Sequence, residues 1–223
     1  MLAHAGYRRA RTFFTPANAQ SYDRLARSAT FGRDMAWKRE IVRAIGNANP
    51  VLELACGTGI LSSMLASAGR HVVGLDLTFD YLRATQRKLE LPLAQGTAEV
   101  LPYRDSSFGG MVSSYLAKYV DIDRLTDECW RVLRPGGVAV FHDFAYPSDP
   151  AVQGLWNLYF SILRLCGKFA SSWKVVFEQL DDVIRESRWE SRIQASLHSR
   201  GFTKICCNYH TFGTASIVRA EKP

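Results

Sequence analysis

Residues 51–61, with the sequence VLELACGTGIL, constrain the fold of this chain more than any other segment. A short apolar run containing the acid Glu53 leads into a turn of small residues, and a helix-like stretch begins at Ile60. This order predicts a strand, a tight turn and a helix. Such junctions often bind cofactors, because glycine backbone and the free N–H groups at the start of the helix are accessible there.

Strands and helices alternate from Pro50 onward. The expected strands are residues 51–54, 71–75, a weak one near Leu93, 110–114 and 138–144. The expected helices are residues 60–68, 79–89 and 123–133, and a turn at 134–137 precedes the last strand. Because helices of this length connect parallel neighbours, the alternation predicts a mostly parallel sheet with helices on both faces. Two more strands, 202–208 and 212–219, joined through residues 209–211, would close the sheet as an antiparallel pair.

The length of 223 residues predicts a single domain. We divide it into N-terminal helices (1–48), a cofactor-binding core (49–146), a helical cap (147–188) and a C-terminal helix with the strand pair (189–223). In the first part, residues 1–15 are interpreted as a loosely held arm, followed by helices at 20–28 and 34–45. Further helices are expected at 173–184 and 188–199.

Residues 151–169 form another predicted helix, and it is apolar on nearly every side. Its large apolar residues are Leu155, Trp156, Leu158, Tyr159, Phe160, Ile162, Leu163 and Leu165. Arg164 is its only charge before Lys168. A helix of this composition either is buried or presents one face to an apolar partner. The sequence favours the second interpretation only slightly.

Composition excludes several kinds of protein. A hydrophobic share of 47% with 22% charged residues is typical of a globular chain, and no apolar run is long enough to span a membrane. The five cysteines include no Cys-x-x-Cys pair, so we expect a reducing cytoplasm and no metal site. The net charge of +7 comes from dispersed basic residues, which argues against a nucleic-acid groove.

The chemistry of the glycine turn favours one kind of cofactor. A dinucleotide-binding turn requires Gly-x-Gly-x-x-Gly, and the third glycine is missing here, where Ile60 and Leu61 follow the turn. The acid Glu53 would repel a diphosphate but suits a cation, such as the sulfonium and ammonium groups of S-adenosylmethionine. Asp76, which follows the second strand, is placed to bind ribose hydroxyls.

These motifs, in their order and spacing, resemble those of class I S-adenosylmethionine-dependent methyltransferases: Glu53-x-Ala-Cys-Gly-Thr-Gly59, Asp76, Gly96-Thr-Ala-Glu-Val-Leu-Pro102 and Arg131-Val-Leu-Arg-Pro-Gly-Gly137. Flanking segments are similar to the ubiquinone/menaquinone biosynthesis C-methyltransferase family: Ser21-Tyr22-Asp23, Thr30-Phe31-Gly32 with Trp37-Lys38-Arg39, Gly201-Phe202 and the run YHTFGTASIV at 209–218. The resemblance implies an α/β fold with a Rossmann-like, seven-stranded, mostly parallel sheet. It also implies an antiparallel last strand, helices on both faces, N-terminal helices and an apolar helical cap insertion.

The same resemblance implies S-adenosylmethionine as the cofactor and assigns it a set of residues: Glu53, Gly57, Thr58, Gly59, Asp76, Leu77, Thr97, Ala98 and Ser114. Glu53 would neighbour the methionine end, and the glycines would let the cofactor backbone approach the turn. Asp76 would bind the ribose, and Leu77 would lie against the adenine face. Thr97 stands where the family usually has Asp or Asn to read the adenine edge.

On the acceptor side, Lys118 and Tyr119 stand where the quinone-pathway enzymes carry an Arg-Asn pair. Because ligands bind at the carboxyl ends of parallel strands, we expect Lys118, His142, Asp143 and Tyr22 to face the pocket. A phenol titrates near ~10 in water, so the Lys118 cation would lower its pKa, and His142 or Asp143 would accept the proton. Lys118, Asp143 and His142 are the candidate catalytic residues.

Our first hypothesis is methylation of a ring carbon of a prenylated quinol, such as demethylmenaquinol or a ubiquinol precursor. The alternatives are O- or N-methylation of another small molecule and, in a different class, a non-catalytic binding or assembly protein that keeps the cofactor fold. A lipophilic acceptor would suit the apolar cap, and dispersed positive charge would favour peripheral contact with the inner face of a membrane. Homo-oligomerisation stays open.

Overall fold

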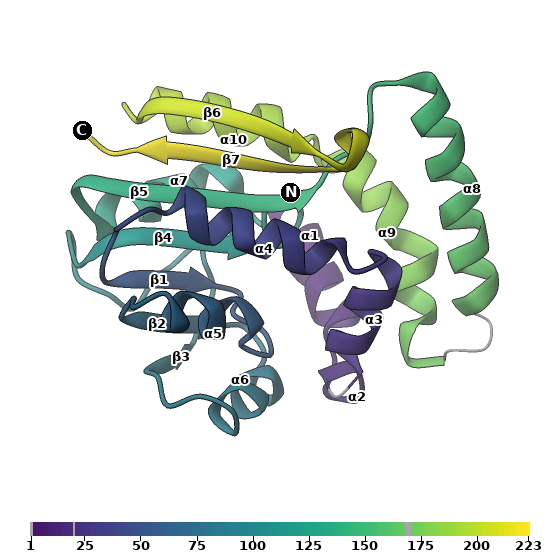
Figure 1. Ribbon diagram of the computed structural model, residues 1–223, viewed down its shortest axis with the longest axis horizontal. Helices are drawn as coiled ribbons and strands as arrows, with labels where there is room; N and C mark the ends of the chain where they lie inside the picture. The colour runs from purple at the N-terminus through teal and green to yellow at the C-terminus, as the bar shows by residue number, and fades with distance from the viewer. Residues whose placement is uncertain (1, 20, 168–170) are drawn as a thin grey trace.

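The computed structural model describes residues 2–19, 21–167 and 171–223. One seven-stranded sheet runs through the molecule in the order β3-β2-β1-β4-β5-β7-β6 (Figure 1). Its strands are β1 Val51–Leu54, β2 Val72–Asp76, β3 Leu93–Gln95, β4 Phe108–Ser114, β5 Leu133–Phe144, β6 Thr203–His210 and β7 Ala215–Glu221. β7 runs antiparallel to both β5 and β6, and the other paired strands are parallel, which confirms the predicted Rossmann-like fold class.

The helices follow the predicted alternation closely. They are α1 Leu2–Phe13, α2 Pro16–Ala19, α3 Tyr22–Ala29, α4 Arg33–Ala44, α5 Ile60–Ser67, α6 Phe79–Gln86, α7 Ile122–Val132, α8 Pro150–Gly167, α9 Lys174–Ser187 and α10 Trp189–Ser199. Short 3-10 turns lie at η1 Ala117–Tyr119, η2 Ser171–Trp173 and η3 Thr211–Gly213. The last two positions of the predicted helix 151–169 lie outside the described residues.

Successive side chains of the central strands enter two apolar layers, one on each face of the sheet. Val138 and Val140 of β5 pack in the layer with α4 and α5, whereas Ala139 and Phe141 pack in the layer with α7 and α10 (Figure 1). Adjacent residues of a strand point to opposite faces, so a strand buried on both faces must be apolar throughout. This explains the continuous apolar runs that predicted the sheet.

The expectation of a loosely held arm at residues 1–15 is wrong. Residues 2–13 form α1, which ends at the fully buried Phe13. The Phe13 ring lies edge-on to Tyr119 with the ring centroids 5.9 Å apart, and Phe14 contacts Tyr119 in the same way at 5.8 Å. The segment has an apolar face, because Ala10, Phe13 and Phe14 have helical spacing. The prediction missed this face because arginines dominate the composition of the segment.

Two smaller corrections concern the strands. The predicted turn at residues 134–137 interrupts β5 rather than preceding it: the ladder with β4 pairs Phe108 with Leu133 and resumes at Gly110 with Val138. The last two strands are joined by η3, so residues 209 and 210 belong to β6 and Phe212 lies in the connection. The alternating pattern did not reveal these irregular backbone segments.

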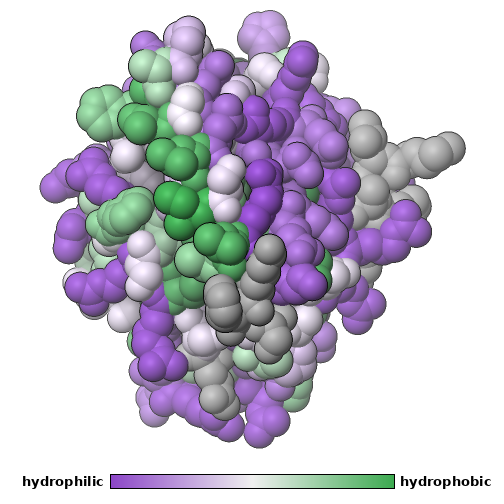
Figure 2. Space-filling view, turned by 90° about the vertical axis from the view of Figure 1, so that its right-hand side faces the viewer, coloured by the Kyte–Doolittle hydropathy of each residue, from purple (hydrophilic) through white to green (hydrophobic). Residues whose placement is uncertain are grey.

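The hairpin of α8 and α9 stands beyond the carboxyl ends of the parallel strands (Figure 1). Trp156 and Phe160 of α8 are buried against α9, whereas Leu155, Leu158, Ile162 and Leu165 are exposed by 67%, 58%, 51% and 57%. Figure 2 shows a green, apolar stripe on the side of the molecule where α8 lies in Figure 1. The helix therefore has one packed and one exposed apolar face. None of the helices in the described ranges is long and apolar enough to cross a bilayer.

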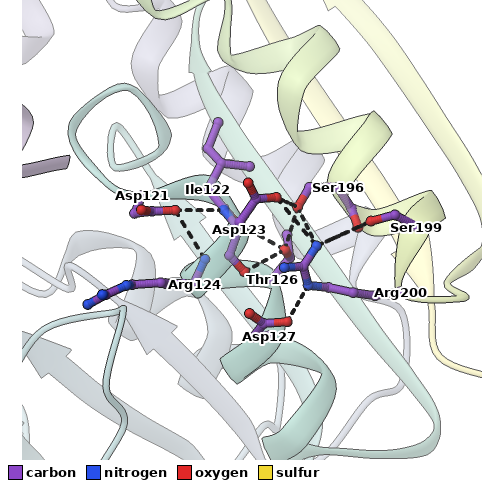
Figure 3. Close-up of polar contacts among 9 residues, drawn as sticks. All are labelled: Asp121, Ile122, Asp123, Arg124, Thr126, Asp127, Ser196, Ser199 and Arg200. Carbon is purple, nitrogen blue, oxygen red and sulfur yellow. Dashed lines mark hydrogen bonds and ion pairs between the residues drawn. The ribbon is translucent and has the colours of Figure 1, made fainter. Parts of the chain in front are cut away.

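A polar network joins α7 to α10 behind the sheet (Figure 3). Arg200 Nε donates to Asp127 Oδ1 (2.5 Å), and the Ser196 hydroxyl donates to Asp123 Oδ1 (2.5 Å). The Thr126 and Ser196 hydroxyls lie 2.7 Å apart. Because this network holds α10 in place, the first residue of that helix is fixed in the core.

That first residue, Trp189, is the basis of a stability prediction. Trp189 is fully buried, and its Nε1 donates to the Phe144 carbonyl (2.7 Å) at the end of β5. We expect Trp189→Ala to lower the free energy of unfolding by about 3–5 kcal/mol, because it leaves a large cavity. Urea unfolding measures the loss. Arg200→Ala should lower the free energy of unfolding far less, since the carboxylate partners of Arg200 are exposed. Equal losses in the two variants would contradict this prediction.

Candidate active site

The turn after β1 holds a shape that requires glycine. Gly57 and Gly59 have φ values of +57° and +81°, and a Cβ atom on Gly59 would lie 2.8 Å from the methyl carbon of Thr85. Two contacts bind the turn from outside: Gly57 N donates to Asp76 Oδ2 (2.8 Å), and the Thr85 hydroxyl donates to Gly57 O (2.8 Å). The turn is therefore fixed by the protein itself.

A cavity opens above this turn at the carboxyl edge of the sheet. Of the residues that the resemblance assigned to the cofactor, those lining it are Glu53, Gly57, Thr58, Asp76, Leu77, Thr97, Ala98 and Ser114. Gly59 is outside the lining and instead shapes the turn. Phe14 and Tyr22 close the opposite side, and the Thr58 hydroxyl donates to Asp23 of α3. The N-terminal helices thus cover the cavity.

Two carboxyl groups in this cavity form no ion pair with a described residue. Burial raises the pKa of Glu53, which is 2% exposed, to about 8, although the Ser62 hydroxyl donates to its Oε2. Burial also raises the pKa of Asp76 to about 6, despite hydrogen bonds from backbone N–H groups. The buried Tyr81 hydroxyl has no hydrogen-bond partner in the described part of the chain. Lys38 also lines the cavity but is paired with Asp34, so Glu53 and Asp76 have no ion-pair partner among the described residues. The Tyr81 hydroxyl is available to a ligand.

A second cavity of about 500 Å³ lies beside the first. Its walls are mainly aromatic and aliphatic and include Trp156, Tyr159, Phe160, Leu163, Trp173 and Phe177. Phe14, Tyr22, Ala26, Tyr115 and Tyr119 line both cavities, so the two share one wall. A ligand in the second cavity would meet a ligand in the first at this wall.

The shared wall contains a polar group that the sequence reasoning missed. The Tyr115 hydroxyl donates to Asp34 Oδ1 (2.9 Å), and Asp34, only 2% exposed, forms an ion pair with Lys38 on the same helix. Burial, reinforced by the Asp34 charge, raises the pKa of Tyr115 well above 10, so this phenol is neutral near pH 7. Asp34 and Lys38 lie four residues apart on a predicted helix, and that spacing was the available signal.

The expected placement of the acceptor-side residues is correct for Tyr22 and Lys118, which line the second cavity. It is wrong for His142 and Asp143, which are fully buried and line neither cavity. β5 continues to Phe144 and pairs with β7 at both positions, so the edge of the sheet lies beyond them. The end of the strand was predicted correctly at Phe144; the error lies in expecting the side chains at 142 and 143 to face the pocket, whereas both are fully buried.

The buried residues instead bind one another. Asp143 Oδ1 accepts from Lys118 Nζ (2.5 Å), and His142 Nδ1 shares a hydrogen bond with the Ser114 hydroxyl (2.9 Å). Burial lowers the pKa of Lys118 and raises that of Asp143, while their mutual attraction opposes both shifts. Burial also lowers the pKa of His142 well below 6.5, so its ring is neutral.

Comparisons of the sequence and of the structure with known proteins both find methyltransferases. A family model described as a methyltransferase domain matches residues 52–141. A demethylmenaquinone methyltransferase from Clavibacter sepedonicus is 30% identical over 213 residues, covering 92% of this chain and 87% of that protein. One from Thermus thermophilus is 29% identical over 216 residues, covering 92% and 98%.

Two solved structures share the fold. A possible histamine N-methyltransferase from Thermotoga maritima has a TM-score of 0.68 at 13% identity, covering 98% of this chain and 100% of that one. Geranyl diphosphate C-methyltransferase from Streptomyces coelicolor, solved with S-adenosylhomocysteine, has a TM-score of 0.61 at 13% identity, covering 85% and 79%.

The sheet, the glycine turn and these comparisons define an S-adenosylmethionine-dependent methyltransferase. Within this class, the chain belongs to the family of quinone-biosynthesis C-methyltransferases that includes the demethylmenaquinone methyltransferases. S-adenosylmethionine is therefore its cofactor, and we expect it to bind in the first cavity. The unpaired Glu53 and Asp76 suit its cationic groups and ribose, and Tyr81 offers an unused hydroxyl.

We expect S-adenosylmethionine to release protons as it binds near neutral pH. Its ammonium and sulfonium charges favour the ionised form of Glu53, whose pKa in the free protein is about 8. The bound protein therefore holds fewer protons, and the affinity rises as the pH approaches 8. Calorimetry at pH 7 in two buffers of different ionisation enthalpy measures this release, which Glu53→Gln should lose. Equal release by both proteins would remove Glu53 from the cofactor site.

The same variant should be more stable than the parent when no cofactor is present. Because the folded protein holds the Glu53 proton more tightly than the unfolded chain, this group's contribution to stability is lost as the pH rises from about 4.5 to 8. Gln does not titrate, so Glu53→Gln should unfold at a higher urea concentration at pH 8. Unchanged or lower stability at that pH would contradict the burial argument.

Proposed function

We propose that this methyltransferase acts on a ring carbon of a prenylated quinol, such as demethylmenaquinol or a ubiquinol precursor. The observation that carries the proposal is the wall shared by the cofactor cavity and a mainly apolar cavity of about 500 Å³. An apolar cavity of this size suits a ring with a hydrocarbon tail better than a small polar amine or alcohol. The names of the curated relatives support the same substrate class.

When bound, S-adenosylmethionine supplies a methyl group on a sulfonium, which is a good leaving group. The remaining tasks of the protein are alignment of the acceptor and exclusion of water. We assign both tasks to the aromatic shared wall, where Phe14 contacts Tyr22 and Tyr119 edge-on with ring centroids 6.0 and 5.8 Å apart. The acceptor ring would lie against these side chains, with its tail in the apolar cavity.

We assign the polar contact with the acceptor to Tyr115 and Asp34. Tyr115 lines both cavities, and its hydroxyl bonds the Asp34 carboxylate, which Lys38 holds in place. In the overall reaction, the ring gains a methyl group and loses one proton. Asp34, through the Tyr115 hydroxyl, is placed to receive that proton and to orient an acceptor hydroxyl.

Lys118 and Asp143 have a positioning role in this proposal. Lys118 Nζ donates to the Tyr115 carbonyl (3.2 Å) and lies 4.6 Å from the centroid of the Tyr119 ring. Because Asp143 neutralises this ammonium, its effect on an acceptor phenol is weakened. The pair would instead fix Tyr115 and Tyr119 of the shared wall. The buried His142 ring packs edge-on against Tyr115.

The direct test is to incubate the protein with labelled S-adenosylmethionine and a short-tailed demethylmenaquinol, and to identify the product by mass spectrometry and NMR. We expect label on the ring carbon, together with S-adenosylhomocysteine. Label on oxygen or nitrogen would favour the alternative small-molecule reaction. Cofactor binding without transfer to this quinol or to any component of a lipid extract would favour a non-catalytic role.

Tyr115→Phe tests the acceptor-side assignment. Removing the hydroxyl should lower kcat by roughly tenfold or more, because the acceptor loses its polar partner, and should leave cofactor affinity unchanged. Steady-state kinetics and calorimetry measure the two effects. Tyr103→Phe is the matched control, since the buried Tyr103 hydroxyl has no partner among the described residues and lines neither cavity. Full activity in Tyr115→Phe would exclude the proposed role.

A further inference from the structure

The geometry points to a lipid-docking surface formed by the exposed face of α8 with Phe31 and Phe212. This surface would bind an anionic bilayer and bring the opening of the acceptor cavity into contact with it. We call it the docking face and define its apolar part as Leu155, Leu158, Ile162, Leu165, Phe31 and Phe212. The docking itself is independent of the acceptor's identity. Delivery of the acceptor through this mouth rests on the proposed function.

The stripe on α8 is the first observation. Leu155, Leu158, Ile162 and Leu165 follow one another at intervals of three or four residues, so they form one line along the helix, and each is more than half exposed. These four residues span 155–165 of α8, Pro150–Gly167, and an apolar stripe is visible on this side of the molecule in Figure 2. Exposed faces of helices in water are normally polar, and an apolar stripe of this length marks a contact surface.

Two aromatic side chains extend the stripe across the cavity mouth. Phe31 and Phe212 are 82% and 85% exposed, and both have positive φ values, +50° and +57°. Bulky residues rarely adopt this conformation, and such strain is concentrated at functional sites. Both rings and Leu155 also line the apolar cavity. The exposed patch is therefore continuous with the interior of the acceptor cavity.

Arginines surround this apolar surface. Arg24, Arg27 and Arg33 are exposed on α3 and just beyond it, beside Phe31 in the chain, and Arg33 Nε donates to the Thr211 hydroxyl next to Phe212 (3.3 Å). The segment 209–214 has no acidic residue, and Arg164 is the only charged residue of α8. An apolar surface with a basic rim complements anionic lipid headgroups over an acyl layer.

The helical geometry also places the acidic neighbours away from the stripe. Tyr159 reaches the Ala29 carbonyl of α3 (2.5 Å), whereas Arg164 reaches Asp181 of α9 (3.1 Å). At about 100° per residue, Leu158 and Ile162 project on the α3 side of the outer face. The exposed acids Glu178, Asp182 and Glu186 belong to α9, so the arginine side of α8 would face the membrane.

A second copy of the chain fits this surface less well than a bilayer does. In a two-fold dimer the same patch faces itself, which would bring two arginine rims together. A dimer would also close the cavity mouth from outside. A bilayer has opposite charge at the rim and leaves the mouth open to its acyl layer.

The experiment measures binding to vesicles without donor or acceptor. Leu158→Gln/Ile162→Gln/Leu165→Gln changes only exposed side chains that line neither cavity. We expect the parent to sediment with vesicles of phosphatidylcholine and phosphatidylglycerol, and the triple variant to bind at least roughly tenfold more weakly. Phe79→Gln/Val100→Gln is the matched control, because these side chains are 57% and 68% exposed but lie outside the patch. The control should bind like the parent.

A second variant isolates the basic rim. Arg24→Gln/Arg27→Gln should weaken binding to the anionic vesicles and reduce its salt dependence, while binding to pure phosphatidylcholine stays as weak as before. Parent-like vesicle binding by the triple variant, or no binding by the parent, would overturn the proposal. So would a parent dimer that the triple variant dissociates in analytical ultracentrifugation. Vesicle binding with no quinol methylation would remove only the proposed substrate.

Discussion

The fixed conformation of the glycine turn after β1 is the constraint on which the rest of this structure depends. Asp76 receives the Gly57 N–H from one side, Thr85 donates to the Gly57 carbonyl from another, and Gly59 leaves no space for a Cβ atom beside Thr85. These contacts join β1, β2 and α6 at one point. Because the turn is fixed, Glu53 and Asp76 are held at the cavity wall rather than turned toward solvent.

Glu53 and the Lys118–Asp143 pair are buried ionisable groups with different roles. Glu53 is left without an ion-pair partner, so the folded protein loses stability as this group ionises, and a cationic ligand recovers that loss. Lys118 and Asp143 are buried and paired with each other, and Lys118 also contributes to the lining of the second cavity. Glu53, a buried acid without an ion-pair partner, thus lies in the first cavity, whereas the paired buried charges, Asp34 with Lys38 and Lys118 with Asp143, hold Tyr115.

The cofactor half of the site could be predicted from the sequence because its residues are fixed by local strand–turn–helix units. Glu53, Gly57 and Asp76 lie at strand ends whose positions follow from hydrophobic runs and glycines. The acceptor half depends on contacts between distant segments. Asp34 and Tyr115 are 81 residues apart in the chain, yet their side chains are hydrogen-bonded.

The errors have the same physical origin. His142 was expected in the pocket because it lies near the carboxyl end of β5, which ends at Phe144 as predicted, but β5 pairs with β7 at that position and the His142 side chain is fully buried. The segment before Thr15 was interpreted as an arm because its arginines dominate its composition. Its role depends on two phenylalanines that meet Tyr119, more than one hundred residues further along the chain. No local pattern encodes such a contact.

Donor and acceptor sites are thus built from different kinds of structure. The strand ends and turns of the sheet line the first cavity, whereas α3, α8 and α9 contribute to the second, and the two cavities share one aromatic wall. Substitutions on α8 and α9 would change the shape and polarity of the second cavity without contacting the glycine turn, whereas α3 reaches the turn through the hydrogen bond of Asp23 with Thr58. In the proposed function, the acceptor would therefore be selected by the helices that surround the shared wall.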